Sequence, residues 1–104
     1  MQAETLKGHL DGLVLATLQD RALHGYAVIE ELRGRSAGAF DLAEGTVYPV
    51  LHRLEAEGLL TSAWSSTAGR RRRMYRLTRR GRTALGRRRE EWRRFAGAVE
   101  AVLT

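Results

Sequence analysis

The run of residues 44–81 constrains the fold of this 104-residue chain more than any other segment. Apolar residues at helical spacing predict a helix over about residues 45–57, and Gly58 then acts as its C-terminal stop. Two alternating segments, 60–64 and 73–77, predict the strands of a β-hairpin around a loop rich in Ser, Thr and Gly. The run therefore predicts a helix that is followed at once by a β-hairpin.

Helices are expected on both sides of this run. Apolar spacing indicates amphipathic helices over residues 6–18 and about 24–35, with a turn between them. The alternation at residues 40–42 allows a very short strand before the third helix. Thr78 is a good N-cap for a last helix that runs to about Leu103. The expected fold is mainly α with a small β-hairpin wing.

Composition restricts the class of protein. At 104 residues, the chain is long enough for one small domain with a modest core. It has no cysteine, which excludes disulfides and thiolate metal sites. Its apolar runs fall short of the roughly 20 residues of a membrane-spanning helix, and the N-terminus lacks the charged-then-apolar order of a signal peptide. We therefore expect a cytoplasmic protein.

Features of an enzyme are weak in this sequence. The three histidines, His9, His24 and His52, do not have the spacing of metal ligands. No nucleophile, base and acid stand out as a set, and the sequence has no Gly-rich phosphate loop. We expect neither enzymatic activity nor a cofactor or metal.

Positive charge is concentrated in the second half of the chain. The net charge is +6, but residues 1–57 hold nine acidic and five basic residues, which gives −4. Residues 58–104 hold thirteen arginines and three glutamates, which gives +10. The planar guanidinium suits bidentate phosphate contacts, although strong use of arginine over lysine also fits a GC-rich genome. Contacts to a polyanion are therefore expected in the second half.

The helix expected over residues 45–57 has an outer face suited to DNA. When its apolar side chains are buried, short or hydrogen-bonding residues remain near its N-terminal end. A recognition helix presents this end to base edges, and its free N–H groups attract phosphate. The residues of this face are Gly45, Thr46, Tyr48, Pro49, His52 and Arg53. Taken alone, the pattern is also that of an ordinary amphipathic helix with a solvated face.

Four consecutive arginines, Arg70, Arg71, Arg72 and Arg73, lie at or just past the tip of the expected hairpin. Like charges so close together repel one another unless a polyanion neutralises them. Alternation places Arg71 and Arg73 on one face and Arg70 and Arg72 on the other, so that only part of the set can touch one DNA backbone. A basic tip directly after such a helix favours phosphate contact over a merely solvated loop.

Three segments carry a family resemblance: LHGYAVIEEL (23–32), EGTVYPVLHRLEAEGLL (44–60) and GRRRRMYRLTRRG (69–81). In this order and at this spacing they resemble the PadR family of bacterial transcription regulators. The resemblance implies a winged helix-turn-helix domain, a homodimer, and binding to a roughly palindromic operator, usually as a repressor. The residues that it places near DNA, besides the wing arginines, are Tyr26, Thr46, Tyr48 and His52.

The last helix carries a second apolar pattern. Leu85, Trp92 and Val99 repeat every seven residues, and Phe95 and Val102 repeat in the complementary register. Such a stripe needs a cover, which is either the first helix of the same chain or the same helix of a second subunit. The family resemblance favours the dimer, and both contacts are compatible. We therefore expect a DNA-binding domain over residues 1–78 and a dimerisation helix over residues 79–104.

Trp92 is also a candidate for an effector site. The resemblance implies that short proteins of this family bind flat aromatic or cationic compounds at the dimer interface. The arginines near Trp92 favour an anionic or neutral aromatic ligand, and plain interface packing is the alternative. The residues assigned to the interface or effector pocket are Leu85, Trp92, Phe95, Ala96, Val99 and Val102.

The leading interpretation is a dimeric, sequence-specific transcriptional regulator, most simply a ligand-responsive repressor, whose partner is double-stranded DNA. Two other functions stay open. The arginine-dense segment 79–94 allows an interaction module whose basic helix binds an acidic protein or a membrane surface. An RNA-binding protein is less well supported, because the sequence lacks several aromatic residues suited to base stacking.

Overall fold

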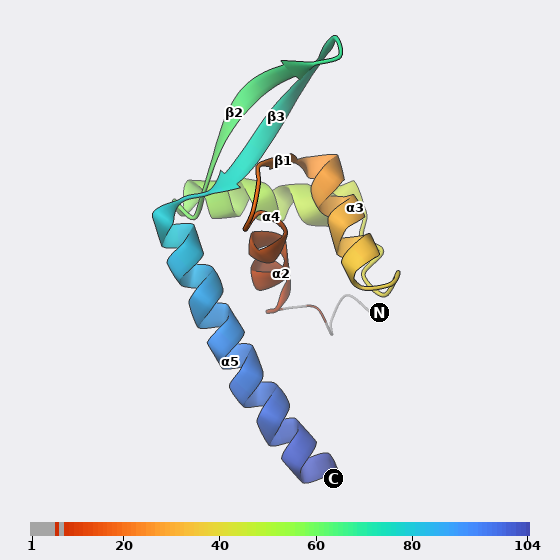
Figure 1. The fold of residues 1–104 in the computed structure, drawn as a ribbon, viewed down its shortest axis with the longest axis vertical. Coiled ribbons are helices and arrows are strands. Elements are labelled where there is room, and N and C mark those ends of the chain that lie inside the picture. Colours follow the sequence, from red (N-terminus) through yellow and green to blue (C-terminus); the bar gives the residue numbers. More distant parts are fainter. Residues whose placement is uncertain (1–5, 7) are drawn as a thin grey trace.

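In the computed structural model the chain runs through α2, β1, α3, α4, β2, β3 and α5, and the structure describes residue 6 and residues 8–104. The helices are Leu10–Thr17 (α2), Gly25–Arg35 (α3), Glu44–Ala56 (α4) and Arg79–Leu103 (α5), and the strands are Leu23–His24 (β1), Leu60–Thr67 (β2) and Arg70–Leu77 (β3). Figure 1 shows the first three of these helices gathered together, with the β2–β3 hairpin projecting from one side and α5 extending from the other.

The hairpin is a regular antiparallel pair joined by a two-residue turn. Its register runs from Leu60 opposite Leu77 at the base to Thr67 opposite Arg70 beside the turn. The turn residues 68–69 both have positive φ, at 54° and 75°, which matches the twist of the flanking strands. The sheet order is β1-β3-β2, so β3 lies between the two other strands.

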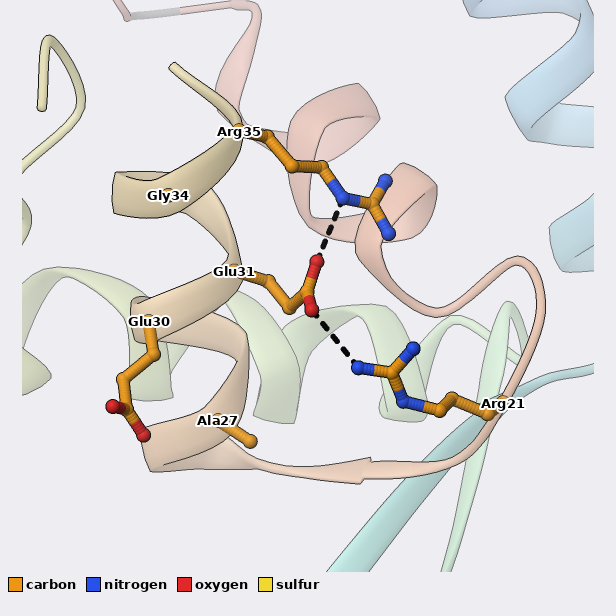
Figure 2. Close-up of a pocket in the computed structure, with 6 residues that line it drawn as sticks. All are labelled: Arg21, Ala27, Glu30, Glu31, Gly34 and Arg35. Atoms are coloured by element: carbon orange, nitrogen blue, oxygen red, sulfur yellow. Dashed lines mark hydrogen bonds and ion pairs between the residues drawn. The ribbon is translucent and has the colours of Figure 1, made fainter. Parts of the chain in front are cut away.

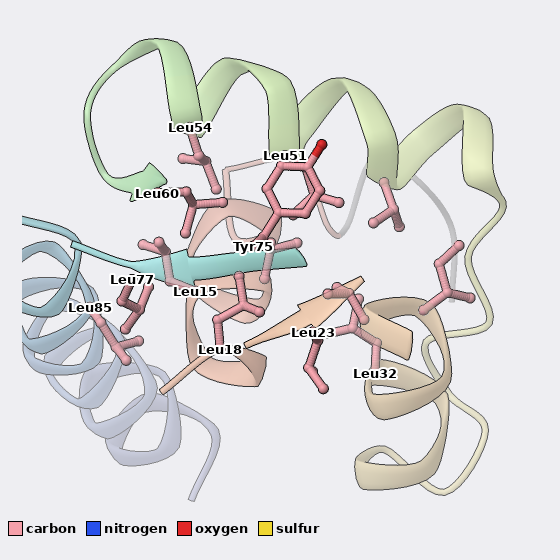
Figure 3. Packing of buried hydrophobic residues seen from close by; sticks show 14 residues of the cluster. Leu15, Leu18, Leu23, Leu32, Leu51, Leu54, Leu60, Tyr75, Leu77 and Leu85 are labelled. Atoms are coloured by element: carbon pink, nitrogen blue, oxygen red, sulfur yellow. The ribbon is translucent and has the colours of Figure 1, made fainter. Parts of the chain in front are cut away.

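The base of the hairpin belongs to the hydrophobic core, whereas its tip does not. Leu60, Tyr75 and Leu77 lie among leucines of α2 and α4 (Figure 3). The core consists of Val14, Leu15, Leu18, Leu23, Val28, Ile29, Leu32, Val47, Leu51, Leu54, Leu60, Tyr75, Leu77 and Leu85. Full burial of each such side chain contributes about 1.5–3 kcal/mol, so the wing is anchored at its base while its distal half stays in solvent.

The junction between the hairpin and α5 is tightly packed. The Thr78 side chain accepts a hydrogen bond from the Gly81 amide at 3.0 Å and donates one to the Gly58 carbonyl at 2.7 Å, as expected of an N-cap that also ties down the preceding turn. A Cβ on Gly81 would lie 2.0 Å from the Leu59 carbonyl oxygen. Glycine at position 81 therefore allows α5 to begin directly against the start of β2.

The four long helices and the hairpin are present, and the structure departs from the prediction in two short strands and in the bounds of the first helix. Residues 40–42, predicted as a very short strand, form an irregular connection whose Phe40 and Leu42 side chains pack against the core. The additional strand is instead β1, whose Leu23 and His24 pair with Tyr75 and Met74 of β3. This strand was missed because two residues are too few to show alternation, and its formation depends on the open edge of β3.

The first helix is shorter than predicted. It was expected over residues 6–18, whereas α2 begins at Leu10, after a turn at Gly8 and His9. Gly8 has a φ of +88°, which is incompatible with a continuous helix. Residues 1–5 and 7, which include part of the predicted helix, lie outside the described residues. Among the described helices, none combines the length and apolar character needed to cross a membrane.

Candidate nucleic-acid interface

The outer face of α4 is solvent-accessible near the N-terminal end of the helix. Val47, Leu51 and Leu54 are buried, as their spacing predicts. The opposite side leaves exposed the backbone or side chains of Gly45, Thr46, Pro49, His52 and Arg53. Pro49 lies inside the helix, in its second turn, where it removes one backbone donor. This face therefore presents glycine, proline and hydrogen-bonding side chains to solvent.

Tyr48 connects α4 to the beginning of α3. A Cβ on Gly25 would lie 2.3 Å from Tyr48 Cε1, so the ring packs where a side chain at position 25 would stand. Burial, and to a lesser extent the charge of Glu44, raises the pKa of the Tyr48 hydroxyl. Tyr26, the next residue of α3, is 49% exposed. The start of α3 thus presents one exposed tyrosine, Tyr26, and holds Tyr48 of α4 against Gly25.

Arg53 differs from the other residues of this face because its guanidinium is engaged within the chain. It donates to both carboxylate oxygens of Asp11 on α2, at 2.5 and 3.0 Å. It also lies 3.6 Å from a carboxylate oxygen of Glu57. These contacts direct Arg53 toward α2 and raise its pKa, first through the hydrogen bond to Asp11.

The hairpin register divides the four arginines between two faces, as alternation predicts. Arg73 is paired with Trp64 and Arg71 with Ser66, so both share a face with the indole. Arg72 and Arg70 are paired with Ser65 and Thr67, which places them on the opposite face. The guanidinium carbons of Arg71 and Arg73 lie 4.6 and 5.3 Å from the centroid of the Trp64 ring. The wing is therefore basic on both faces but contains an aromatic ring on only one of them.

The distal part of α5 presents an uncovered apolar face. The exposed fractions are 52% for Trp92, 57% for Phe95 and 86% for Val102. Leu85 differs from these residues, because it is only 3% exposed and belongs to the core of the chain. Val99 is 38% exposed, so the apolar surface continues toward the C-terminal end of the helix.

A groove of about 620 Å³ lies where α5 passes α2. Its aromatic floor contains His9 and Trp92 with ring centroids 5.4 Å apart, edge to face, and Phe95 at 6.0 Å from Trp92. Arg88 and Arg89 also line it. Arg88 donates to the Gly8 carbonyl at 3.1 Å and Arg89 to the Gln19 side chain, so both arginines join α5 to the segments that flank α2. The groove combines an aromatic, apolar surface with an edge formed by two arginines and Glu91.

A second hollow, of about 500 Å³, lies beside α3 and contains ion pairs of the chain itself (Figure 2). Glu31 accepts hydrogen bonds from Arg35 at 2.7 Å and from Arg21 at 2.9 Å. These hydrogen bonds lower the pKa of the Glu31 carboxyl, and the bond from Arg35 has the larger effect. This cluster ties the turn after α2 to α3, which explains it as a structural feature.

Comparison with known proteins identifies the family of this chain. Residues 14–87 match the sequence model of the Transcriptional regulator PadR-like family. The chain belongs to this family. The match covers α3, α4 and the whole hairpin, and it ends at Arg87 of α5. The PadR-like chain is therefore a transcriptional regulator and not an enzyme, as the sequence indicated.

Individual relatives agree with this assignment. The transcriptional regulator Rv3488 of Mycobacterium tuberculosis is 44% identical over 72 residues, which cover 69% of this chain and 64% of that protein. A PadR family transcription regulator from Clostridium difficile R20291 has 31% identity and a TM-score of 0.82, over 93% of this chain and all of that one. Bacillus subtilis PadR, solved in complex with operator DNA, shares the fold at 24% identity, with a TM-score of 0.69 over 76% of this chain and 45% of that one.

Sequence reasoning missed three contributors to the site of this PadR-like chain. Trp64 was read only as part of an alternating strand, although its position opposite Arg73 follows once the turn length is known. Glu55 and Ser62, which join Arg73 to α4, become neighbours only through the hairpin register. In the sequence, the alternation that places Ser62, Trp64, Arg71 and Arg73 on one face was the available signal.

Proposed function

We propose that this regulator binds a palindromic operator as a homodimer, with α4 in the major groove and the β2–β3 hairpin against the phosphate backbone. The observation that carries the proposal is the exposed N-terminal face of α4 beside a wing with four arginines. Helix N-termini and short polar side chains suit base edges, whereas guanidinium groups suit phosphate. Operator binding by Bacillus subtilis PadR, which shares the fold, supports the same role here.

Base preference is assigned mainly to α4. Thr46, Tyr48 and His52 offer hydroxyl and imidazole groups for hydrogen bonds, and Gly45 and Pro49 allow close approach of the helix. Tyr26, at the start of α3, is proposed to contact the sugar-phosphate backbone of the DNA. Arg53 has the weakest support in this set, because Asp11 engages its guanidinium. The wing arginines are proposed to supply affinity for any duplex sequence.

The homodimer is proposed to form through the apolar face of α5. Trp92, Phe95 and Val102 are each more than half exposed, and burying them against the same helix of a second subunit would remove this surface from water. A two-fold axis would also present two α4 helices to half-sites one turn of DNA apart, about 34 Å. This spacing is the reason to expect a palindrome.

The groove between α2 and α5 is proposed as the effector site. Its aromatic floor suits a flat ring system, and the charges of Arg88 and Arg89 favour an anionic or neutral compound over a cation. An effector there would alter the tilt or spacing of the two α4 helices and release the operator. Repression in the cytoplasm, relieved by such a ligand, is the simplest form of this function.

Binding is tested by fluorescence anisotropy with a duplex from the region upstream of the protein's own gene and a random duplex of equal length. The proposal expects tighter binding to the upstream duplex at moderate salt. Thr46→Ala should reduce the ratio of the two affinities, because base contacts carry sequence preference. Equal affinity for both duplexes at every salt concentration, with the dimer intact, would contradict the proposed function. Binding to anionic vesicles in place of DNA would favour the basic-helix interaction module.

A further inference from the structure

Trp64 lies at the centre of a cluster on one face of the wing. The residue is 54% exposed, and two guanidinium groups lie over its ring. Their Cζ atoms are 4.6 Å (Arg71) and 5.3 Å (Arg73) from the ring centroid. Both distances are within the range in which a guanidinium is attracted to the face of an indole. The indole therefore has its charged neighbours on the distal, solvent-exposed half of the hairpin.

The same cluster is anchored to α4. Arg73 Nε donates to Ser62 Oγ at 2.8 Å, and Ser62 Oγ donates to Glu55 Oε2 of α4 at 2.5 Å. Arg73 Nη2 also lies 3.9 Å from the same carboxylate oxygen. A continuous set of contacts thus runs from α4 through the hairpin to Arg71, near the tip.

We propose that Trp64 is a positioning residue for DNA binding, which holds Arg71 and Arg73 side by side as a preorganised pair for phosphate. The inference rests on the proposed DNA-binding function. Stacking uses the flat face of a guanidinium and leaves its edge available to phosphate oxygens. In Arg73 the Nε group donates to Ser62 and Nη2 lies near Glu55. Phosphate would therefore be bound by the remaining N–H groups of Arg73 together with those of Arg71. A long side chain that is already held loses less conformational freedom on binding, which increases affinity without an added contact.

The arrangement makes the four arginines unequal. Arg71 and Arg73 share the face of the indole, and this face continues into the contact with α4 through Ser62. Arg70 and Arg72 lie on the opposite face. Replacement of Arg71 is therefore expected to weaken DNA binding more than replacement of Arg70, although the two residues are adjacent and each change removes one positive charge.

The test replaces Trp64 by tyrosine, leucine or alanine and measures the affinity of each intact protein for the upstream duplex and for the random duplex over a range of salt concentrations. Trp64→Ala and Trp64→Leu should each weaken binding to both duplexes by about 3- to 10-fold, because the cationic face contacts are lost. Trp64→Tyr should retain most of the affinity, since tyrosine also offers an aromatic face. The leucine variant keeps an apolar side chain and so separates loss of the ring from loss of packing.

Salt dependence distinguishes positioning from charge. The Trp64 variants keep every arginine, so the slope of log affinity against log salt should stay unchanged. Arg71→Ala should reduce the magnitude of this negative slope by about 1, as expected for one lost phosphate contact. Arg87→Ala, which removes the same charge from an exposed position on α5, is the matched control and should leave both affinity and slope close to wild type.

A second measurement needs no DNA. In the free protein, NMR signals of the Arg71 and Arg73 side chains should be displaced upfield by the indole ring current, and Trp64→Leu should abolish this displacement. The proposal is overturned if these signals do not move in Trp64→Leu, or if this variant binds DNA as tightly as wild type. It is also overturned if Trp64→Leu loses affinity only for the upstream duplex, because this would indicate direct base contact by the indole. Absence of preference for the upstream duplex would contradict the proposed function alone, because the random duplex still reports on Trp64.

Discussion

Asp11 of α2 and Arg53 of α4 form a two-bond ion pair, with Arg53 Nη2 2.5 Å from Oδ1 and Nη1 3.0 Å from Oδ2. Arg88 of α5 approaches the same carboxylate, with Nη2 3.4 Å from Oδ2. One half-buried side chain therefore contacts both the helix proposed to read DNA and the helix proposed to form the dimer. The amino-acid separations, 42 and 77 residues, make this a tertiary link and not a local one.

Replacement of Asp11 by asparagine should destabilise the protein by about 1–2 kcal/mol at neutral pH, because Arg53 loses a charged acceptor while solvent screening limits the effect. The hydrogen bond from Arg53 is the main cause that lowers the pKa of Asp11 in the folded chain, and burial opposes it. A lowered native pKa stabilises the folded state above the unfolded pKa of about 3.9. This stabilisation is lost as the pH falls through the lowered native value.

Urea unfolding of wild type and Asp11→Asn at one protein concentration checks this expectation. The difference in free energy of unfolding should be largest above about pH 5 and should shrink as the solution is acidified toward pH 2–3. A difference that stays constant over this range would show that Asp11 does not owe its contribution to the charged pair.

Gly25→Ala should destabilise the fold by about 1–3 kcal/mol, because the added methyl group would overlap the Tyr48 ring at 2.3 Å. In a Tyr48→Ala background the same change should cost much less, since the ring is gone and alanine favours a helix. A double-mutant cycle from urea unfolding measures this coupling. Equal effects of Gly25→Ala in the two backgrounds would contradict the packing described.

Ala68→Asn should stabilise the hairpin turn by about 0.5–1 kcal/mol. Ala68 has a φ of +54°, a left-handed conformation that alanine adopts at a cost and asparagine tolerates better. Gly69→Ala, which introduces a side chain at a φ of +75°, is the opposite change and should destabilise the turn. Thermal unfolding should therefore rank the asparagine variant above wild type and the Gly69 variant below it.

Phe95→Glu or Val102→Glu should convert the proposed dimer into monomers, because a carboxylate would be buried at an apolar contact. Sedimentation analysis measures the assembly, and anisotropy with the upstream duplex measures the consequence for DNA binding. The control is Arg87→Ala, which lowers the net charge by the same single unit at an exposed position outside the apolar stripe of α5. A monomeric wild-type protein, or dimers that survive both changes, would argue against α5 as the interface.

Long elements were predictable because their pattern repeats several times. The spacing of Val47, Leu51 and Leu54 fixed the buried side of α4, and Thr78 marked the start of α5 correctly. β1 was not predictable, since its two residues form a strand only by pairing with β3. The irregular connection at residues 40–42 resembles a strand in its alternation but pairs with none of the described strands.

The site was predictable to the extent that it lies on single elements. The exposed face of α4 follows from helical spacing alone. The neighbours of Trp64 follow from cross-strand register, which depends on a turn of two residues at positions 68–69. The contact of Asp11 with Arg53 needs the packing of α2 against α4, about which neither local sequence contains a signal.

The junction at Thr78 and Gly81 has a mechanical consequence. Because the first turn of α5 is hydrogen-bonded and closely packed against the base of the hairpin, this end of the helix has little freedom to pivot. With 25 residues, α5 is a lever about 37 Å long. A shift of about 3 Å at the C-terminal end of α5 corresponds to a tilt of the helix axis by roughly 5°. Because the junction is rigid, the hairpin would rotate by the same angle.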